Sequence, residues 1–463
     1  MKKMMLNSSA NPLAIFSNRK LFLLAFLILA LSCNKTVQSP DTGTSRSPDP
    51  AFKGNGYIGI NVLLSEEPGT DILKDLGAYG TVLKVFPEIK ALTMKVPGDK
   101  LPVIKSLSYV RAANPDAVRQ GSPVDAVPVS NFTTGLNTWN LDAVNVTDLN
   151  AGRSVAEDGE GVYVGVLDTG LPDSWRQYFP EERIATQYAK SFGGGGGENG
   201  NVSEQPNKWE HDQSTHGGHV TSTIIGYKFG SAYFNGVAPK ATIIPVKILN
   251  QNGSGWSSVI AEGIVYIAKL KDGELSENPV IINMSLGGPV LDAVESAALD
   301  YAISKGVIII ASAGNSGAAG MGYPGAYKPV ISVAAAGWKS EFSTPDWWYN
   351  LDVAEPTDVS DFYLAGFSSR QLTGQDLDVT APGVYIVGPY QFNSGQLTYA
   401  FLRGTSMASP HVAGIIALML QKKASLTPAE VETILESVAL PMSEGANAAG
   451  SGFITASAAL SGL

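Results

Sequence analysis

The sequence predicts an α/β fold in which a doubly wound parallel sheet follows a small α+β domain. Two observations support this prediction. From Leu136 onward, short and almost wholly apolar runs alternate with amphipathic stretches of helical length, a pattern typical of strands that are buried on both faces. In residues 53–116, by contrast, short runs alternate in the manner of strands and enclose two short helical stretches.

The larger domain is expected to comprise residues 136–463. Its strands are predicted at Val162–Leu167, Thr242–Val246, Val280–Asn283, Val307–Ala311 and Val330–Ala334. Its helices are predicted at His216–Ile225, Ser257–Lys271, Leu291–Lys305, Ser406–Lys422 and Pro428–Ser437. In sheets of this kind, functional groups gather where strands end and the following helices begin, so a site is expected at that edge.

The small domain, residues 53–116, shows the order β-α-β-β-α-β. Strands are predicted at Tyr57–Leu63, Thr81–Val85, Ala91–Val96 and Tyr109–Ala112, and helices at Asp71–Leu76 and Leu101–Leu107. Residues 117–135 show little regular pattern, and we expect them to form a linker that is cut during processing.

Residues 1–33 have the features of an export signal. Their apolar run, from Leu21 to Leu31, follows basic residues and is too short for a bilayer core, which needs about 20 residues. The run leads into Ala30-Leu31-Ser32-Cys33, which resembles a bacterial lipoprotein signal, so a lipid on Cys33 is expected to anchor an exported protein to the membrane. The alternative is an ordinary secretory signal with an incidental cysteine. Residues 34–52 are polar and are expected to form a flexible tether.

The composition excludes several classes of protein. The net charge is −10 and no run is rich in Lys or Arg, so we expect no nucleic acid as a partner. Cys33 is the only cysteine, which excludes a disulfide within the exported part and a cysteine nucleophile. With 44% hydrophobic residues the chain can bury a sizeable core. We expect the protein to be a monomer.

Three segments place chemically active residues at the expected edge of the sheet. They are Gly165-Val166-Leu167-Asp168-Thr169-Gly170, Thr215-His216-Gly217-Gly218-His219-Val220 and Gly404-Thr405-Ser406-Met407-Ala408-Ser409-Pro410. In this order they resemble the Asp, His and Ser signatures of the subtilisin family. The resemblance implies a serine endopeptidase that cuts peptides or proteins through an acyl-enzyme. It also implies that the small domain is a propeptide, which assists folding and inhibits the enzyme until it is removed.

The resemblance assigns a role to each of these residues. A hydroxyl is a poor nucleophile at neutral pH and needs a base that a carboxylate orients. Ser406 is then the nucleophile, His216 the general base and acid, and Asp168 the group that orients His216. Asp212 lies nearer to His216 in the sequence, but it lacks the position at the end of a strand. Asn315, in Ala311-Ser312-Ala313-Gly314-Asn315-Ser316-Gly317, resembles the residue whose amide binds the oxyanion.

Substrate-binding segments are implied in the same way. Gly253, Ser254 and Gly255 resemble one wall of the family's cleft, and Ser285, Leu286 and Gly287 resemble the other. A peptide would bind between them as an added β-strand. Gly322, which precedes a Tyr-Pro pair, corresponds to the floor of the primary specificity pocket. Without a side chain or a charge there, we expect a preference for large apolar residues on the acyl side of the cut bond.

The remaining histidines are not expected to take part in catalysis or to bind a catalytic metal. His219 and His411 are expected to be structural and His211 to lie at the surface, and no His-Glu-x-x-His motif suggests zinc. No cofactor is expected for the chemistry. The family often carries a calcium loop, but Tyr227–Asn235 contains no Asp, so that loop is expected to be absent, although a structural calcium elsewhere stays possible.

Two alternatives to a peptidase can be weighed. An inactive binding or scaffold protein of the same fold would have no need of Asp168, His216, Asn315 and Ser406 together. An esterase would be expected to carry Gly-x-Ser-x-Gly, which Gly404-Thr405-Ser406-Met407-Ala408 is not. The acidic and aromatic segment near residues 338–362 is longer than usual for the family, and the sequence does not tell whether it covers the cleft or packs on the core.

Overall fold

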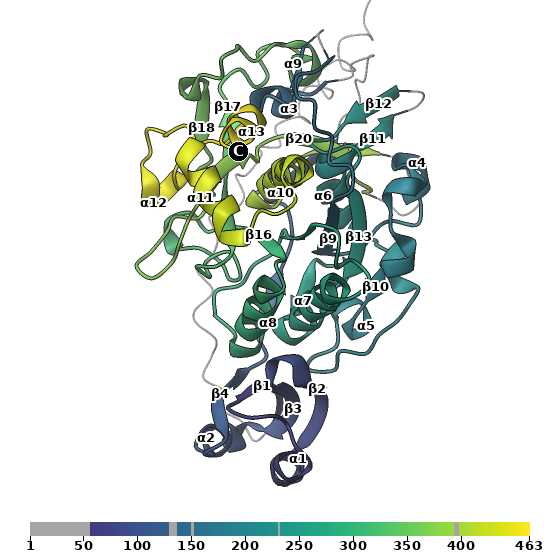
Figure 1. The fold of residues 1–463 in the computed structure, drawn as a ribbon, viewed down its shortest axis with the longest axis vertical. Coiled ribbons are helices and arrows are strands. Elements are labelled where there is room, and N and C mark those ends of the chain that lie inside the picture. Colours follow the sequence, from purple (N-terminus) through teal and green to yellow (C-terminus); the bar gives the residue numbers. More distant parts are fainter. Residues whose placement is uncertain (1–55, 129–136, 150–151, 230–231, 393–397) are drawn as a thin grey trace, which may run out of the picture. The chain divides into compact units, whose positions relative to one another are not determined.

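The computed structural model describes residues 56–128, 137–149, 152–229, 232–392 and 398–463. The predicted export signal, Cys33 and the tether lie outside these residues. Gly54–Leu463 forms one compact unit, shown in Figure 1. No helix in the described ranges combines the length and the apolar character needed to cross a membrane.

The centre of this unit is a mainly parallel sheet in the order β10-β13-β9-β15-β16-β17-β18, with β19 beside β17. Only β17 and β18 pair antiparallel. The strands are β9 (Tyr163–Asp168), β10 (Lys190–Ser191), β13 (Thr242–Lys247), β15 (Val280–Met284), β16 (Ile308–Ser312), β17 (Ile331–Trp338), β18 (Phe362–Leu364) and β19 (Val379–Pro382). All five strands predicted for the larger domain are present, and with them the predicted fold class is confirmed.

Helices cover both faces of this sheet (Figure 1). They are α6 (His216–Ile225), α7 (Ser257–Asp272), α8 (Ala293–Ser304), α10 (Thr405–Lys422), α11 (Pro428–Val438) and α13 (Ala456–Ser461). Side chains that alternate along a strand enter different cores, as β15 illustrates. Ile281 belongs to the core that includes α6 and α10, whereas Ile282 belongs to the core that includes α7 and α8. This division explains why the strands are apolar throughout.

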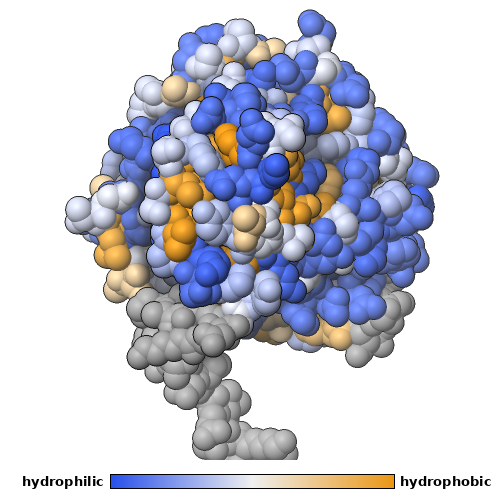
Figure 2. Space-filling view, turned by 90° about the horizontal axis from the view of Figure 1, so that it is seen from below, coloured by the Kyte–Doolittle hydropathy of each residue, from blue (hydrophilic) through white to orange (hydrophobic). Residues whose placement is uncertain are grey.

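The small domain is a four-stranded antiparallel sheet in the order β2-β3-β1-β4, with two helices. Its elements are β1 (Tyr57–Leu64), α1 (Thr70–Gly77), β2 (Thr81–Phe86), β3 (Ala91–Pro97), α2 (Leu101–Lys105) and β4 (Val110–Pro115). Apolar side chains from the strands and both helices form its own core. The face of the molecule seen in Figure 2 is mostly hydrophilic, with small and separate apolar patches, which need no partner to cover them.

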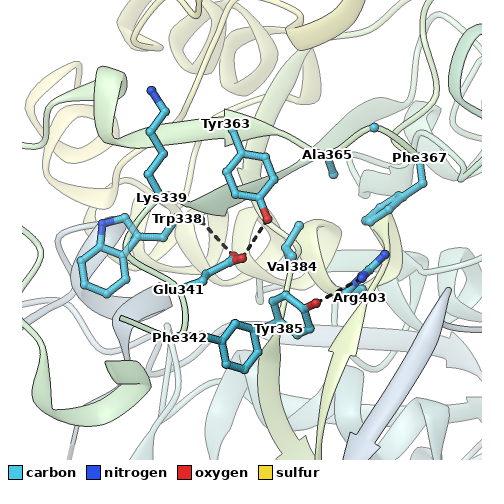
Figure 3. A pocket seen from close by; sticks show the side chains of 11 residues that line it. Trp338, Lys339, Glu341, Phe342, Tyr363, Ala365, Phe367, Val384, Tyr385 and Arg403 are labelled. Carbon is cyan, nitrogen blue, oxygen red and sulfur yellow. Dashed lines mark hydrogen bonds between the residues drawn. The ribbon is translucent and has the colours of Figure 1, made fainter. Parts of the chain in front are cut away.

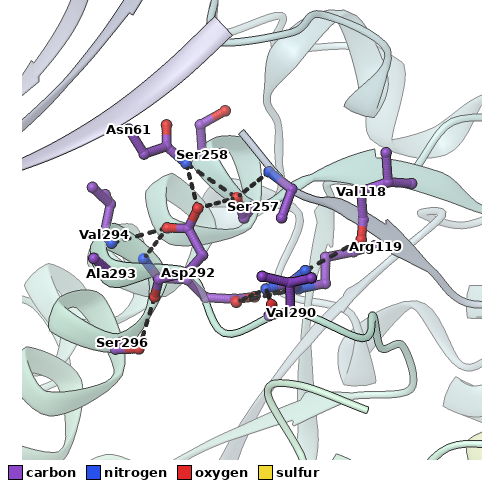
Figure 4. A network of polar contacts seen from close by, with 12 residues as sticks. Asn61, Val118, Arg119, Ser257, Ser258, Val290, Asp292, Ala293, Val294 and Ser296 are labelled. Carbon is purple, nitrogen blue, oxygen red and sulfur yellow. Dashed lines mark hydrogen bonds and ion pairs between the residues drawn. The ribbon is translucent and has the colours of Figure 1, made fainter. Parts of the chain in front are cut away.

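A buried polar network joins the small domain to the helices beneath the main sheet (Figure 4). Asp292 caps α8 by accepting hydrogen bonds from the backbone N–H groups of Val294 and Glu295, at 2.9 and 3.0 Å. Its other oxygen accepts from Asn61 Nδ2 of β1 at 2.8 Å. Asp116, directly after β4, accepts from Ser258 N at the start of α7, at 3.0 Å. Acceptors at helix N-termini satisfy backbone donors that have no partner within the helix. The capping by Asp292 also explains why α8 begins later than the predicted Leu291.

The segment near residues 338–362 packs on the core. Trp347 and Trp348, on the short helix α9 (Trp347–Asn350), are buried, as is Trp338 at the end of β17. The Trp347 ring stacks on Phe401, and the Trp338 ring stacks on Trp139, with centroids 5.8 and 6.1 Å apart. The aromatic residues of this segment therefore hold it against the larger domain.

Two short strands occur in the linker, where the sequence pattern predicted none. They are β5 (Val118–Gln120), which pairs with β14 (Ser254–Trp256), and β6 (Asp125–Pro128), which pairs with β21 (Tyr399–Arg403). Each exists because of a partner strand far away in the sequence, so the local pattern could not reveal it.

Candidate active site

Asp168 and His216 meet at the carboxyl edge of the main sheet. Asp168 is the last residue of β9, and His216 is the first residue of α6. The Nδ1 atom of His216 lies 2.8 and 3.0 Å from the two carboxylate oxygens of Asp168. Because a carboxylate can only accept, Nδ1 carries the proton, and in the neutral ring Nε2 is the basic nitrogen.

The surroundings of this pair set the basicity of His216. Both side chains are fully buried. Burial lowers the pKa of His216, whereas the attraction and the hydrogen bond of Asp168 raise it, and the pKa ends above its ordinary value. The imidazolium is thus the form that Asp168 stabilises.

Ser406 lies in the first turn of α10 and is nearly buried. Its Oγ donates to the backbone oxygen of Ser285 at 3.2 Å. Within the described ranges, Nε2 of His216 is buried without a hydrogen-bond partner. The structure therefore shows the carboxylate–imidazole pair formed and the hydroxyl turned to Ser285 instead of to the imidazole. Catalytic hydrogen bonds often tighten only when substrate is bound.

Asn315 is held beside the start of α10. Its Oδ1 accepts from the backbone N–H of Thr405 at 2.9 Å and from the Thr405 hydroxyl at 3.0 Å. The same hydroxyl accepts from Gly314 N at 3.1 Å. With Oδ1 fixed in this way, the Nδ2 group is the end of the amide left for another acceptor. Thr405 was not singled out from the sequence; the only signal for it was its place next to Ser406.

A second carboxylate, Asp212, is hydrogen-bonded to the loop that follows Asp168. Its Oδ2 accepts from the Thr169 hydroxyl at 2.7 Å, and that hydroxyl in turn accepts from Gly217 N at 2.9 Å. Burial raises the pKa of Asp212 to about 7. Asp212 thus fixes the loop after Asp168 to the first turn of α6, whereas the hydrogen bonds to His216 come from Asp168.

The other histidines occupy places of different kinds. His219 is buried with Nε2 3.0 Å from Ile386 O, and burial lowers its pKa to about 3. His411 is buried between Asn140 and Met407, and burial lowers its pKa to about 4. His211 is exposed and lies 2.6 Å from Asp173. Two of the three are therefore neutral core residues near neutral pH.

Residues 118–121 of the linker lie between the two segments that were expected to bind substrate. On one side, β5 pairs with β14, so that Gln120 faces Ser254 and Arg119 faces Gly255. On the other side, Gln120 and Gly287 exchange two backbone hydrogen bonds, of 3.0 and 2.8 Å. Gly121 N donates to Gly253 O at 2.8 Å. The two segments that were expected to form the cleft thus enclose a stretch of the chain itself, which pairs with both of them.

The remaining residues of the expected cleft divide into two groups. The Leu286 side chain points into the core beside α7 and α8, so only its backbone can line the cleft. Gly322, in contrast, lies against the Ser285–Gly287 wall. A Cβ atom placed on it would meet Gly288 N at 3.4 Å and Gly287 Cα at 3.5 Å. Gly322 therefore lies beside Gly287 and Gly288, at the end of the segment expected to form this wall.

An open pocket of about 470 Å³ is lined by residues that include Glu341, Tyr385 and Arg403, the last residue of β21 (Figure 3). Glu341 lies inside it, where its carboxylate accepts from the Tyr363 hydroxyl at 2.8 Å and from Trp338 N at 3.1 Å. Burial raises the pKa of Glu341 to about 7. Arg403 lines the same pocket and donates to the Tyr385 hydroxyl at 3.2 Å. The segment near residues 338–362 supplies one wall.

Among the residues that the structure describes, two groups of carboxylates are close enough together to hold a metal ion. They are Asp142, Asp148 and Asp352, and Asp376, Asp378 and Glu432, whose ligand atoms lie within 4.8 Å of one another in each group. Neither group includes Asp168, His216 or Ser406. Where the calcium loop of the family was considered, the described residues form the hairpin of β11 (Gly226–Phe229) and β12 (Ala232–Asn235).

Comparison with known proteins was made by sequence and by structure. Residues 159–453 match the family described as Subtilase family. Subtilisin DY of Bacillus licheniformis is 34% identical over 286 residues, which cover 61% of this chain and 84% of that protein. Subtilisin E of Bacillus subtilis (strain 168) is 35% identical over 285 residues, which cover 61% of this chain and 61% of that protein.

Solved structures are similar as well. The structure of fervidolysin from Fervidobacterium pennivorans, described as a keratinolytic enzyme related to subtilisin, aligns with a TM-score of 0.64 at 24% identity and covers 88% of this chain and 61% of that one. Sphericase aligns with a TM-score of 0.54 at 27% identity and covers 70% of this chain and 99% of that one. The first likeness concerns the fold alone. The family match, in contrast, extends from before Asp168 to beyond Ser406.

Proposed function

The chain belongs to the subtilase family and is a serine endopeptidase, and on that premise we propose that Asp168, His216 and Ser406 form its catalytic triad. The observation that carries this proposal is the buried pair of Asp168 and His216, which leaves Nε2 as a base without a partner among the described residues. The hydroxyl of Ser406, in the first turn of α10, is the nucleophile that this base would serve.

The mechanism follows from these positions. Ser406 Oγ leaves Ser285 O, passes its proton to Nε2 of His216 and attacks the carbonyl of the substrate. The imidazolium formed in this step is stabilised by Asp168, in agreement with the raised pKa of His216. The Asn315 Nδ2 group and the Ser406 N–H bind the oxyanion. His216 then protonates the leaving nitrogen, and water releases the acyl group from Ser406 by the same route.

A serine-directed phosphonate tests this assignment. Supplied above the millimolar effective concentration expected for the linker, it should label Ser406, as mapped by mass spectrometry, and should not label the His216→Ala variant, because the hydroxyl needs the base. Labelling of another serine with Ser406 unmodified would contradict the proposed triad. Peptide substrates should be cut at a rate that parallels the fraction of protein still unlabelled.

We propose that the small domain and the linker inhibit the enzyme before they are removed. The strand pairing of β5 with β14 and with Gly287 supports this role, since the cleft is filled. Arg119 of β5 forms a fully buried ion pair with Glu295 of α8 and donates to Val290 O at 3.0 Å, so side-chain contacts also connect the linker to the larger domain. We also propose that the protein is exported and carries a lipid on Cys33. Mass spectrometry of the protein purified from its cells would locate the N-terminus and reveal any lipid.

Gly322 is proposed to form the floor of a pocket for large apolar residues. Gly322→Ala and then Gly322→Val should progressively lower cleavage after Phe and Leu relative to cleavage after Ala. One methylene group is worth about 1–3 kcal/mol, so we expect a change in this ratio of about 10- to 100-fold for the valine variant. The added Cβ meets only ordinary contacts of 3.4 Å and longer, so both variants should fold. Profiling a mixed peptide library measures the ratio, and an unchanged ratio would remove Gly322 from the pocket.

A further inference from the structure

The linker contacts both halves of the cleft. On the acyl side, its contacts with the two walls end with the hydrogen bond from Gly121 N to Gly253 O, at 2.8 Å. On the other side, contacts begin with the hydrogen bond from Val124 N to Arg403 O, at 2.7 Å. From there β6 runs antiparallel to β21, with Asp125 opposite Arg403.

These two sets of contacts bracket a stretch with three peptide bonds, of which the central one joins Ser122 and Pro123. Between them lie only Ser122 and Pro123. Ser285, in the acyl-side wall, accepts from Ser406 Oγ, and Arg403, on the other side, precedes Ser406 by three positions. We infer that this central bond, between Ser122 and Pro123, is the one presented to Ser406. Residues 118–122 then occupy the acyl side, and residues 123–128 occupy the leaving-group side.

On the leaving-group side, Arg403 forms an ion pair with the side chain of Asp125 in the linker. Its Nη1 lies 3.3 Å from Asp125 Oδ2 and donates to the Tyr385 hydroxyl at 3.2 Å. Its guanidinium also lies over the rings of Tyr385 and Phe367, at 5.3 and 5.7 Å. The aromatic walls of the pocket in Figure 3 thus contribute to holding the guanidinium in its position beside Asp125.

We propose that Arg403 is a specificity-determining residue that favours an acidic side chain at the third position after the cut bond. This inference rests on the proposed peptidase function and takes Asp125 as the example of a bound residue. The pair is partly exposed, with side chains 28% and 42% accessible, so its effect should be modest.

Competition between two peptides in one tube tests the role of Arg403. The peptides, supplied to the full chain at high concentration, are identical except for Asp or Asn at the third position after the cut. The wild type should cut the Asp peptide about two- to fivefold faster. Arg403→Gln should bring this ratio close to one. Arg176→Gln should keep it, because Arg176 also pairs with carboxylates and stacks on an aromatic ring, but outside the cleft.

The ratio separates two kinds of failure. If the wild type cuts both peptides equally, or if Arg403→Gln keeps the preference, the role of Arg403 is overturned while the peptidase function stands. Because the peptides are supplied above the millimolar effective concentration expected for the linker, failure to cut either peptide would mean that the peptidase function itself fails, and this inference with it.

The identity of Pro123 carries a second inference. When Ser406 attacks, the C–N bond after Ser122 breaks and His216 Nε2 must give its proton to the leaving nitrogen. In proline this nitrogen carries a ring carbon in place of hydrogen, which crowds the side that the acid approaches, and the ring also restricts the residue before it. We propose that Pro123 protects the bond presented to Ser406, so that the linker fills the cleft without being cut there.

Intact mass and N-terminal mapping of the full chain test this protection. The wild type should keep the bond between residues 122 and 123, whereas Pro123→Ala should be cut there with acyl transfer to Ser406 and then to water. Pro128→Ala, in the same linker, should behave as the wild type. Pro123→Ala combined with Ser406→Ala should stay intact, which shows that the cut is made by the chain itself.

Two results would overturn the role of Pro123. One is a Ser406-dependent cut between residues 122 and 123 in the wild type. The other is a Pro123→Ala chain that hydrolyses an added peptide yet keeps its own bond. A Pro123→Ala chain that cuts neither itself nor an added peptide would instead contradict the proposed peptidase function, and the protection of a scissile bond would fall with it.

Discussion

Replacing Ser406 with alanine is expected to abolish peptide hydrolysis and leave the fold intact. The variant removes one buried oxygen, whose contact is with Ser285 O, and little volume changes. In subtilisin, loss of the catalytic serine costs about two million-fold in kcat, a figure that belongs to that relative and sets the scale here. Activity on a peptide substrate and the thermal unfolding midpoint should be measured together, so that loss of activity is not confused with loss of fold.

A matched control is available one turn further along α10. Ser409 is buried, and its hydroxyl meets the Ser285 hydroxyl at 2.9 Å, but it does not take part in the proposed reaction. Ser409→Ala should therefore keep most of the activity. Wild-type turnover in the Ser406→Ala variant would mean that another group is the nucleophile.

Asn315→Ala is expected to lower kcat by about 100- to 1000-fold with a much smaller effect on KM. The range is the one known for the equivalent residue of subtilisin, which is itself a member of this family. The physical reason is that the Nδ2 group donates to an oxygen that is negatively charged only in the transition state. Steady-state kinetics on a single peptide substrate separates the two parameters.

A second substitution at Asn315 distinguishes hydrogen-bond donation to the oxyanion from structural support of the start of α10. Asn315→Asp keeps an oxygen that can accept from Thr405 N and Oγ1 but replaces the donor by an acceptor. If Asn315 only held the start of α10, the aspartate would restore activity. If it donates to the oxyanion, the aspartate should be at least as damaging as alanine. An effect confined to KM in both variants would contradict the oxyanion role.

Much of the fold could be predicted from the sequence because its signals are local. Strands such as β15 are buried on both faces, and their continuous apolar runs reveal them without knowledge of their neighbours. The proposed catalytic residues could also be predicted from local signals, since Asp168 ends a strand and His216 and Ser406 lie in the first turns of helices. That Nε2 has no partner while Ser406 faces Ser285 could not be read from any of these segments.

What escaped prediction depends on distant partners. The linker strands β5 and β6 are short, and they are strands only because β14, Gly287 and β21 pair with them. Thr405 positions Asn315 across 90 residues of sequence, and Asp116 caps a helix that begins 141 residues later. The position of the aromatic segment near residues 338–362 could not be predicted from the sequence, because the stacking of Trp347 on Phe401 is a tertiary contact.

The covalent continuity of the linker sets how strongly it can compete with substrates. A peptide that is part of the same chain meets its cleft at an effective concentration that is commonly in the millimolar range for short connections, and dilution of the protein does not change it. A substrate present at micromolar concentration would therefore rarely displace residues 118–128. A single cut between this segment and the rest of the larger domain would end that advantage, because the inhibitor could then diffuse away. The contacts of Arg119 with Glu295 and Val290 O must also break before the segment can leave. The switch from inactive to active protein would thus be set by when the linker is cut and how fast it leaves, and not by how much enzyme is present.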